Sequence, residues 1–115
     1  MCGIIGTINK RLEFDDLKSL KHRGPDEQNV VYEEVAGQSV CLGQTRLAIV
    51  DLSSAGSQPM RSACGNYVLI FNGEIYNHQE LRGTLKDIQF RGYSDTETIL
   101  YYLINLCYFY EFYNK

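Results

Sequence analysis

Cys2 is the residue whose position most directly suggests chemistry, because only Met1 precedes it. Removal of Met1, which a small second residue generally permits, would leave a thiol and a free α-amino group on one residue. A free thiol titrates near about 8.5 and an α-amino group near about 7.7–8.0. The amine can therefore take the thiol proton and later protonate a leaving amine. Taken alone, Cys2 is better explained as a buried strand residue, because free cysteine is among the most buried residue types.

A thiol that attacks an amide also needs hydrogen-bond donors for the oxyanion that forms. Asn72 and Gly73 follow a strong strand pattern, and would supply a side-chain amide and a backbone N–H that no side chain obstructs. An Asn-Gly pair is equally a common turn at the end of a strand. The pair is therefore a candidate oxyanion hole with a structural alternative.

Three charged residues could hold the two ends of an amino acid. Arg46 has the planar fork that suits a carboxylate, although an arginine can also extend from a strand edge for structural reasons. Glu74 and Asp95 could bind an ammonium group, although Asp95 at a helix start also interacts favourably with the helix dipole. Each residue alone is better explained by structure, and only their combination indicates a site.

The elements that must position these residues are mostly strands in the first part of the chain and helices in the last part. Strands are expected over residues 3–8, 29–35, 39–45 and, most strongly, 66–72. A short helix is expected over 14–21, and two further helices begin after Asn77 and Ser94, each with a glutamate three residues later. The last helix carries an apolar stripe that is expected to face the core and is made of Ile99, Leu100, Leu103, Ile104 and Cys107. Strands in bulk followed by helices predict the α+β class.

Composition limits the chain to one domain and excludes several function classes. At 115 residues with a net charge of −3, it has no basic stripe for nucleic acid and no apolar run long enough for a membrane span. The start lacks the pattern of a secretory leader, so we expect a cytoplasmic protein. The four cysteines show no metal-binding spacing, so we expect no metal site and reduced thiols.

Six segments, in order and with matching spacing, resemble the glutaminase domain of class II glutamine amidotransferases. They are residues 1–6, 22–27, 42–53, 58–60, 71–77 and 92–97. The Arg-Gly-Pro-Asp and Asn-Gly-Glu-Ile-Tyr-Asn forms resemble the asparagine-synthetase branch most closely. The resemblance implies the N-terminal-nucleophile hydrolase fold, an αββα sandwich of two antiparallel sheets between helical layers.

The resemblance also implies an activity and a role for each matching residue. The activity is hydrolysis of glutamine to glutamate and ammonia through a thioester on Cys2, with the α-amine as the base. Asn72 and Gly73 would form the oxyanion hole. Besides these two, the implied glutamine-binding residues are Arg46 for the carboxylate, Glu74 and Asp95 for the ammonium group, and the backbone at Val50. A loop formed by His22, Arg23 and Gly24 is expected to shape the pocket without taking part in chemistry.

The resemblance covers residues 1–104 and gives way to an aromatic-rich tail over residues 105–115. The later strands of the family and its synthetase domain do not follow, so we expect an incomplete sandwich and a truncated gene product. We expect no cofactor in this chain, because ATP and Mg²⁺ belong to the synthetase domain. A separate synthetase domain or chain is the expected partner. A helix continued through the tail would be apolar on nearly every face and would need a partner surface.

Three interpretations follow from the sequence. The first is a glutaminase fragment that acts alone or with a partner that supplies the missing strands and the acceptor site. The second is a truncated, non-catalytic remnant that at most binds glutamine or a partner chain. The third is a small reduced-thiol interaction module whose aromatic tail docks on a partner helix. Six ordered motifs argue against the third.

Overall fold

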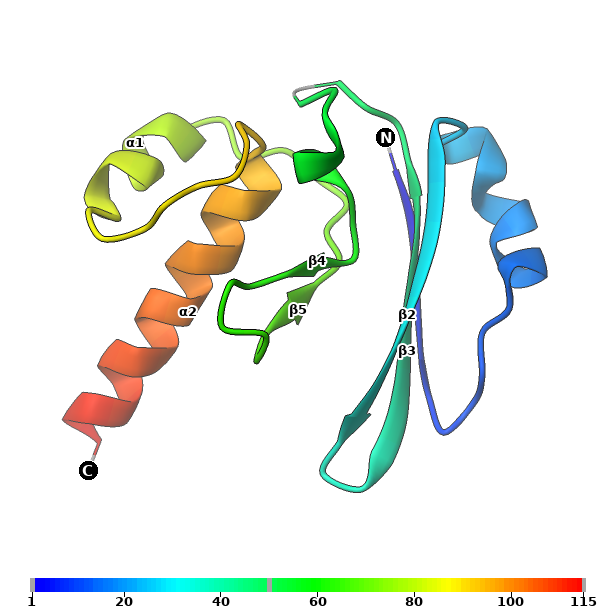
Figure 1. The fold of residues 1–115 in the computed structure, drawn as a ribbon, viewed down its shortest axis with the longest axis horizontal. Helices are drawn as coiled ribbons and strands as arrows, with labels where there is room; N and C mark the ends of the chain where they lie inside the picture. Colours follow the sequence, from blue (N-terminus) through cyan, green and yellow to red (C-terminus); the bar gives the residue numbers. More distant parts are fainter. Residues whose placement is uncertain (1, 50, 115) are drawn as a thin grey trace.

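The main sheet of the protein is three-stranded and antiparallel (Figure 1). The structure is a computed structural model that describes residues 2–49 and 51–114. The sheet contains β1 (Gly3–Ile8), β2 (Glu27–Val35) and β3 (Gln38–Arg46), with β3 in the centre. The strands predicted in these three places are confirmed.

The register of this sheet gathers chemically important residues at one end. Gly3 of β1 pairs with Thr45 of β3, and Glu27 of β2 pairs with Arg46. Cys2 directly precedes β1, so its position is set by the last residues of β3. Residues that are far apart in the sequence therefore meet where β1 and β2 begin and β3 ends.

A two-residue turn joins β2 to β3 and fixes their register. Ala36 has a φ of 51° and Gly37 a φ of 76°, so both lie in the left-handed region. Such turns match the right-handed twist of the flanking strands. Gly37 adopts this conformation without the steric cost of a side chain, and the turn predicted around it is confirmed.

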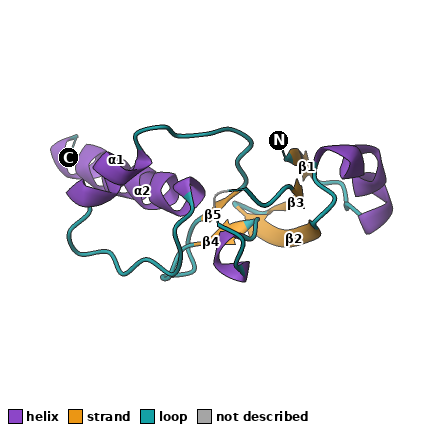
Figure 2. Ribbon diagram, turned by 90° about the horizontal axis from the view of Figure 1, so that it is seen from above, coloured by secondary structure: helices purple, strands orange, loops and turns teal. Residues whose placement is uncertain are grey.

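One face of the sheet is covered by the 3-10 helix η1 (Phe14–Arg23), as Figure 2 shows from above. Leu17 is fully buried there and packs on Gly43 of β3. Gly24 ends this segment against β3, where any side chain would overlap the backbone of Thr45. The helix predicted in this stretch is confirmed in position and has the tighter 3-10 form.

A much smaller sheet lies on the other side of the main sheet. It pairs β4 (Met60–Arg61) with β5 (Val68–Leu69) after the short 3-10 helix η2 (Ser54–Gly56). The long strand predicted over 66–72 is wrong in length, because within the described ranges β4 supplies a ladder partner for two residues only. The backbone beyond β5 finds its hydrogen bonds elsewhere.

Two α-helices, α1 (His78–Thr84) and α2 (Asp95–Tyr113), pack against each other beyond the small sheet (Figures 1 and 2). Ser94 caps α2, since its hydroxyl accepts a hydrogen bond from the Glu97 N–H at 3.1 Å. Asn77 precedes α1 as predicted but makes no side-chain cap bond. The antiparallel sheets and separate helices confirm the α+β class.

The burial of α2 changes along its length. Its first two turns are buried, whereas Leu103 is 44% exposed and Cys107 is exposed. The expectation that the whole stripe faces the core is therefore wrong for Leu103 and Cys107, because described neighbours cover only the start of the helix. The helix runs without interruption across residue 104. Neither α2 nor the other described helices combine the length and the apolar character needed to cross a membrane.

Candidate active site

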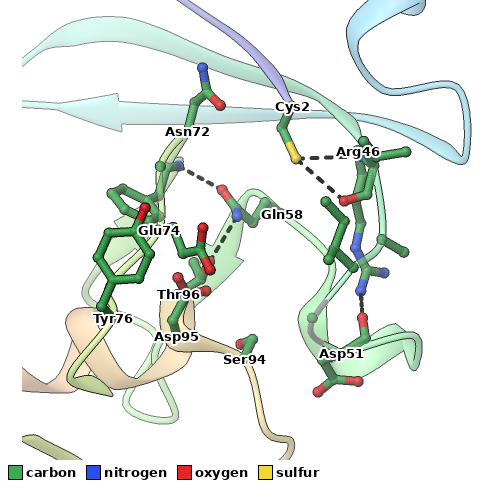
Figure 3. A pocket seen from close by; sticks show the side chains of 16 residues that line it. Cys2, Arg46, Asp51, Gln58, Asn72, Glu74, Tyr76, Ser94, Asp95 and Thr96 are labelled. Carbon is green, nitrogen blue, oxygen red and sulfur yellow. Dashed lines mark hydrogen bonds between the residues drawn. The ribbon is translucent and has the colours of Figure 1, made fainter. Parts of the chain in front are cut away.

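A pocket of about 290 Å³ lies between the end of the main sheet and the start of α2 (Figure 3). It is lined by all of the predicted site residues that the structure describes, namely Cys2, Arg46, Asn72, Gly73, Glu74 and Asp95. The predicted contribution of Val50 lies outside the described residues. The chain start, the end of β3, the loop after β5 and the first residue of α2 thus supply one cavity.

The thiol of Cys2 is fixed by the backbone of the residue that follows β3. The Leu47 N–H donates to Sγ at 3.4 Å, and the thiol donates to the Leu47 carbonyl at 3.8 Å. The Cys2 carbonyl accepts a hydrogen bond from Arg23 Nε at 3.2 Å. Cys2 is half-buried and faces the pocket, so its sulfur is both held and accessible.

The loop formed by His22, Arg23 and Gly24 has a different part from the one predicted. None of the three lines the pocket, and His22 is exposed. Arg23 instead holds the backbone of Cys2, and Gly24 allows the loop to lie against the end of β3. The loop therefore supports the residues that form the pocket wall rather than forming the wall itself.

The guanidinium of Arg46 is buried and already bound to protein acceptors. Its Nη1 contacts the Glu27 carboxylate at 3.1 Å, the Ser53 carbonyl at 3.0 Å and the Ser57 hydroxyl at 3.4 Å. Its Nη2 donates to the Asp51 carbonyl. Nη2 has this one described acceptor, whereas Nη1 has three. Nη1 is therefore engaged by the protein, and the role of Arg46 as the carboxylate ligand stays a prediction.

Glu27, which the sequence analysis gave no role, is the ionic partner of Arg46. Burial alone would raise the pKa of Glu27. Hydrogen bonds from Asn29, Ser57 and Arg46 outweigh that effect and lower the pKa below its usual value. Glu27 therefore carries a negative charge that balances the guanidinium and helps to hold Arg46 in the pocket wall.

Asp51 is a second residue that the sequence analysis missed. Its Oδ1 accepts from the Ser53 N–H at 2.8 Å and the Ser53 hydroxyl at 2.6 Å, and its Oδ2 accepts from the Tyr93 N–H at 2.8 Å. These bonds, chiefly the one from the Ser53 hydroxyl, lower the pKa of Asp51. A serine two residues after an aspartate is a local turn signal, but the link to Tyr93 has no local signal.

The acidic side of the pocket is formed by Glu74 and Asp95, which Figure 3 shows opposite Arg46. Asp95 is buried, and its Oδ2 accepts from the Ile75 N–H at 2.9 Å. This bond ties the loop of residues 72–76 to the start of α2. Glu74 is exposed and leaves its carboxylate free to move toward a bound molecule.

The arrangement of the thiol and the charged side chains defines a class of site. A held thiol faces a pocket that has a buried cation on one side and two carboxylates on the other. Such a pocket complements a small molecule that carries both an anionic and a cationic group, with the thiol placed to attack it.

Comparison with known proteins identifies the family. The model of the glutamine amidotransferase domain matches residues 1–107, so the chain belongs to that family. The chain is 38% identical over 109 residues to glutamine-hydrolyzing asparagine synthetase B of Escherichia coli K12, a match that covers 87% of this chain and 19% of that protein. It is 38% identical over 112 residues to glutamine-hydrolyzing asparagine synthetase 1 of Bacillus subtilis, covering 87% and 17%.

A plant relative gives the same result. Glutamine-hydrolyzing asparagine synthetase 1 of Arabidopsis thaliana is 40% identical over 107 residues, which cover 86% of this chain and 18% of that protein. The chain thus spans about a fifth of the length of the curated relatives it matches. The family resemblance inferred from six ordered motifs is confirmed.

Proposed function

We propose that this chain hydrolyses glutamine to glutamate and ammonia through a covalent thioester on Cys2. The observation that carries the proposal is the convergence of Cys2, Arg46, residues 72–74 and Asp95 on one pocket. Its volume of about 290 Å³ is at the small end of ligand pockets, which suits an amino acid. Membership of the glutamine amidotransferase family supports the same substrate.

The reaction begins when the α-amine of Cys2 takes the thiol proton. The thiolate attacks the side-chain carbonyl carbon of glutamine, and the oxyanion receives hydrogen bonds from the Asn72 amide and the Gly73 N–H. The carbon–nitrogen bond breaks as the α-ammonium returns its proton to the departing ammonia. Water then attacks the thioester, which releases glutamate and restores the thiol.

Charge complementarity orients the substrate for this attack. Arg46 Nη2 binds the α-carboxylate, because Nη1 has three acceptors in the protein and Nη2 has one. Glu74 and Asp95 bind the α-ammonium group from the opposite side of the pocket. We also propose, from the family motif alone, that the backbone at Val50 contributes to glutamine binding. The side-chain amide of glutamine then points toward Cys2.

The chain's wider setting follows from its relatives. Those relatives are glutamine-hydrolysing asparagine synthetases, so we propose that the ammonia is used by a synthetase domain or chain that binds ATP and Mg²⁺. We also propose that the main sheet and η1 form part of the four-layer N-terminal-nucleophile hydrolase sandwich. Four free thiols are typical of a reducing compartment, which supports a cytoplasmic setting.

A second candidate is a chain that binds glutamine or a partner without turning substrate over. One observation favours it: the second half of α2 exposes Tyr108, Phe109, Tyr110, Phe112 and Tyr113. Exposed apolar patches of this kind mark interaction surfaces. The two candidates differ in whether Cys2 completes catalytic cycles.

Labelling and turnover distinguish the candidates. The purified chain is treated with a chloroketone analogue of glutamine and analysed by intact mass, which also reports whether Met1 is removed. One equivalent should add to the chain, and Cys2→Ala should abolish the addition. The exposed-thiol control Cys64→Ser should label normally. Ammonia release from glutamine supports the first candidate, labelling without turnover supports the second, and retained Met1 overturns the proposed mechanism.

A further inference from the structure

We propose that Gln58 is a positioning residue for the oxyanion hole, a role that rests on the proposed function. Its side-chain amide connects the backbone of Phe71, which directly precedes Asn72 and Gly73, to Thr96, the neighbour of Asp95. Gln58 thereby sets the location of the oxyanion donors relative to the helix start that holds the substrate ammonium group.

The Gln58 side chain makes two hydrogen bonds, and Figure 3 shows both of them as dashed lines. The Phe71 N–H donates to Gln58 Oε1 at 2.6 Å, and Gln58 Nε2 donates to Thr96 Oγ1 at 3.1 Å. Gln58 is 5% exposed and Thr96 is 4% exposed. Both polar atoms of the Gln58 side chain make a hydrogen bond to the protein, so this residue of the pocket lining braces two neighbouring segments.

The brace replaces strand pairing at the point where pairing ends. The ladder between β4 and β5 stops at Leu69, two residues before Phe71. A part-buried backbone N–H at Phe71 needs another acceptor, and Gln58 supplies it. On the other side, the Phe71 carbonyl accepts a longer hydrogen bond of 3.5 Å from Gln44 Nε2. Two side-chain amides therefore hold Phe71 where neighbouring strands would do so in a longer sheet.

Gln58 is itself anchored to the main sheet. Its backbone carbonyl accepts a hydrogen bond from Asn29 Nδ2 at 3.1 Å, and the Asn29 amide also donates to Glu27 at 2.8 Å. Glu27 in turn contacts Arg46. A continuous chain of contacts thus runs from the carboxylate-binding side of the pocket, through Gln58, to the segment that carries the oxyanion donors.

The consequence for catalysis is geometric. A shift of Phe71 moves Asn72 and Gly73, whereas Cys2 and Arg46 are held by other contacts. A misplacement of about 1 Å costs roughly 10²-fold in rate, and loss of one oxyanion donor costs about 10²–10³-fold. Removal of the brace should therefore lower kcat while binding changes little.

The test uses Gln58→Met, which keeps the length of the side chain and removes both hydrogen bonds. We expect kcat for glutamine hydrolysis to fall about 10- to 100-fold. The KM for glutamine should stay within about threefold, and alkylation of Cys2 by iodoacetamide within about twofold, because Arg46, Asp95 and the thiol each keep hydrogen bonds that do not involve the Gln58 side chain. Circular dichroism checks that the variant is folded.

Thr96 provides a second, independent variant. Thr96→Val removes the acceptor for Gln58 Nε2 and should also lower kcat, whereas Thr96→Ser keeps the oxygen and should retain kcat within about twofold. Because the two residues share one hydrogen bond, the effects of Gln58→Met and Thr96→Val should be less than additive in the double variant. If Gln58→Met fails to fold, the comparison of kcat between Thr96→Val and Thr96→Ser tests the proposal.

Thr98→Val is the matched control for loss of stability. Thr98 is a buried residue of α2. Its hydroxyl accepts a hydrogen bond from Arg82 Nε at 3.0 Å and makes none with Gln58. Its replacement should lower the melting temperature and leave kcat within about twofold of the original, because the oxyanion donors stay in place. An equal loss of kcat in Thr98→Val and Gln58→Met would overturn the positioning role.

The remaining outcomes separate this proposal from the proposed function. Unchanged kcat in Gln58→Met, or a change confined to KM, overturns the positioning role while glutamine hydrolysis stands. If the unaltered chain releases no ammonia, the proposed function fails. Hydrogen exchange at the Phe71 amide then tests whether Gln58 holds this backbone, and the exchange should be at least about tenfold faster in Gln58→Met. An unchanged exchange rate overturns the brace as well.

Discussion

The carboxylate of Asp51 accepts a hydrogen bond from the Tyr93 N–H at 2.8 Å, across 42 positions of sequence. The carbonyl of the same aspartate accepts a bond from the Arg46 guanidinium. Tyr93 lies two residues before Asp95, on the opposite side of the pocket. One residue therefore couples the cationic side of the site to the loop that leads to its acidic side.

This coupling predicts that Asp51→Asn destabilises the fold. An asparagine amide keeps one acceptor for Ser53 but turns an NH₂ group toward the Tyr93 N–H, where no hydrogen bond can form. We expect a loss of about 1–3 kcal/mol in the free energy of unfolding near neutral pH. Urea unfolding measures it, and Asp87→Asn at an exposed position should change it by less than about 0.5 kcal/mol.

The same variant has a defined pH dependence. The pKa of Asp51 is lowered in the folded protein, mainly by the hydrogen bond from Ser53, whereas an unfolded aspartate titrates near about 3.9. The charged form therefore stabilises the fold above about pH 4, and this contribution is lost as the pH falls through the lowered value. The stability gap between the original chain and Asp51→Asn should narrow below about pH 4. A constant gap would contradict the role of the charge.

The residues that line the pocket could be predicted because short sequence motifs contain them. Cys2 stands at the chain start, Asn72 and Gly73 follow an apolar run, and Asp95 follows a helix cap. Each signal lies within a few residues of its neighbours. The main sheet was predictable for the same reason, since alternating apolar residues and a Gly37 turn specify strand pairing locally.

The supports of the pocket could not be predicted because they depend on contacts between distant segments. Gln58 reaches residues 13 and 38 positions away, and Glu27 reaches Arg46 across 19 positions. No local pattern marks an acceptor that completes another segment's hydrogen bonds. The overestimated strand after Asn66 has the same origin, because β propensity does not say whether a partner strand is present.

Arg46 gives a prediction that separates binding from folding. Arg46→Lys keeps the positive charge beside Glu27 but loses the planar fork, so we expect the KM for glutamine to rise about tenfold or more. Alkylation of Cys2 by iodoacetamide should be unchanged. Steady-state kinetics and intact mass measure the two effects. A lysine variant with the original KM would mean that Arg46 does not contact the substrate.

Arg46→Ala should instead damage the fold. It leaves the half-buried Glu27 carboxylate without its cationic partner, so we expect a loss of about 1–3 kcal/mol in the free energy of unfolding. The double variant with Glu27→Gln removes that unpaired charge and should regain part of the lost stability without regaining glutamine affinity. If the double variant is no more stable than Arg46→Ala, the ion pair is not the source of the loss.

Asp95→Asn tests the acidic side of the pocket with little structural change. The amide oxygen of asparagine can still accept from the Ile75 N–H, so the melting temperature should stay nearly constant. The loss of negative charge should raise the KM for glutamine about 10- to 100-fold, because a hydrogen bond to a charged group contributes about 1.5–3 kcal/mol. Thermal unfolding and steady-state kinetics measure both. A large drop in melting temperature with an unchanged KM would make Asp95 purely structural.

Exposed apolar residues in the last turns of α2 should contribute much less to stability than buried apolar residues near its start. Phe109 and Phe112 are 61% and 79% exposed, whereas Leu100 is 3% exposed. Phe109→Ser with Phe112→Ser should change the free energy of unfolding by less than about 0.5 kcal/mol, since serine and phenylalanine have similar helix propensities. Leu100→Ala should cost about 2–5 kcal/mol through lost burial and a cavity.

The double serine variant should also associate less. Large exposed apolar patches drive self-association or partner binding, so sedimentation velocity at rising protein concentration should show fewer oligomers than for the original chain. Leu100→Ala is the control, because it weakens the fold without altering the exposed face. If the double serine variant loses as much free energy of unfolding as Leu100→Ala, Phe109 and Phe112 pack against the fold. The end of α2 is then part of the core and not an interaction surface.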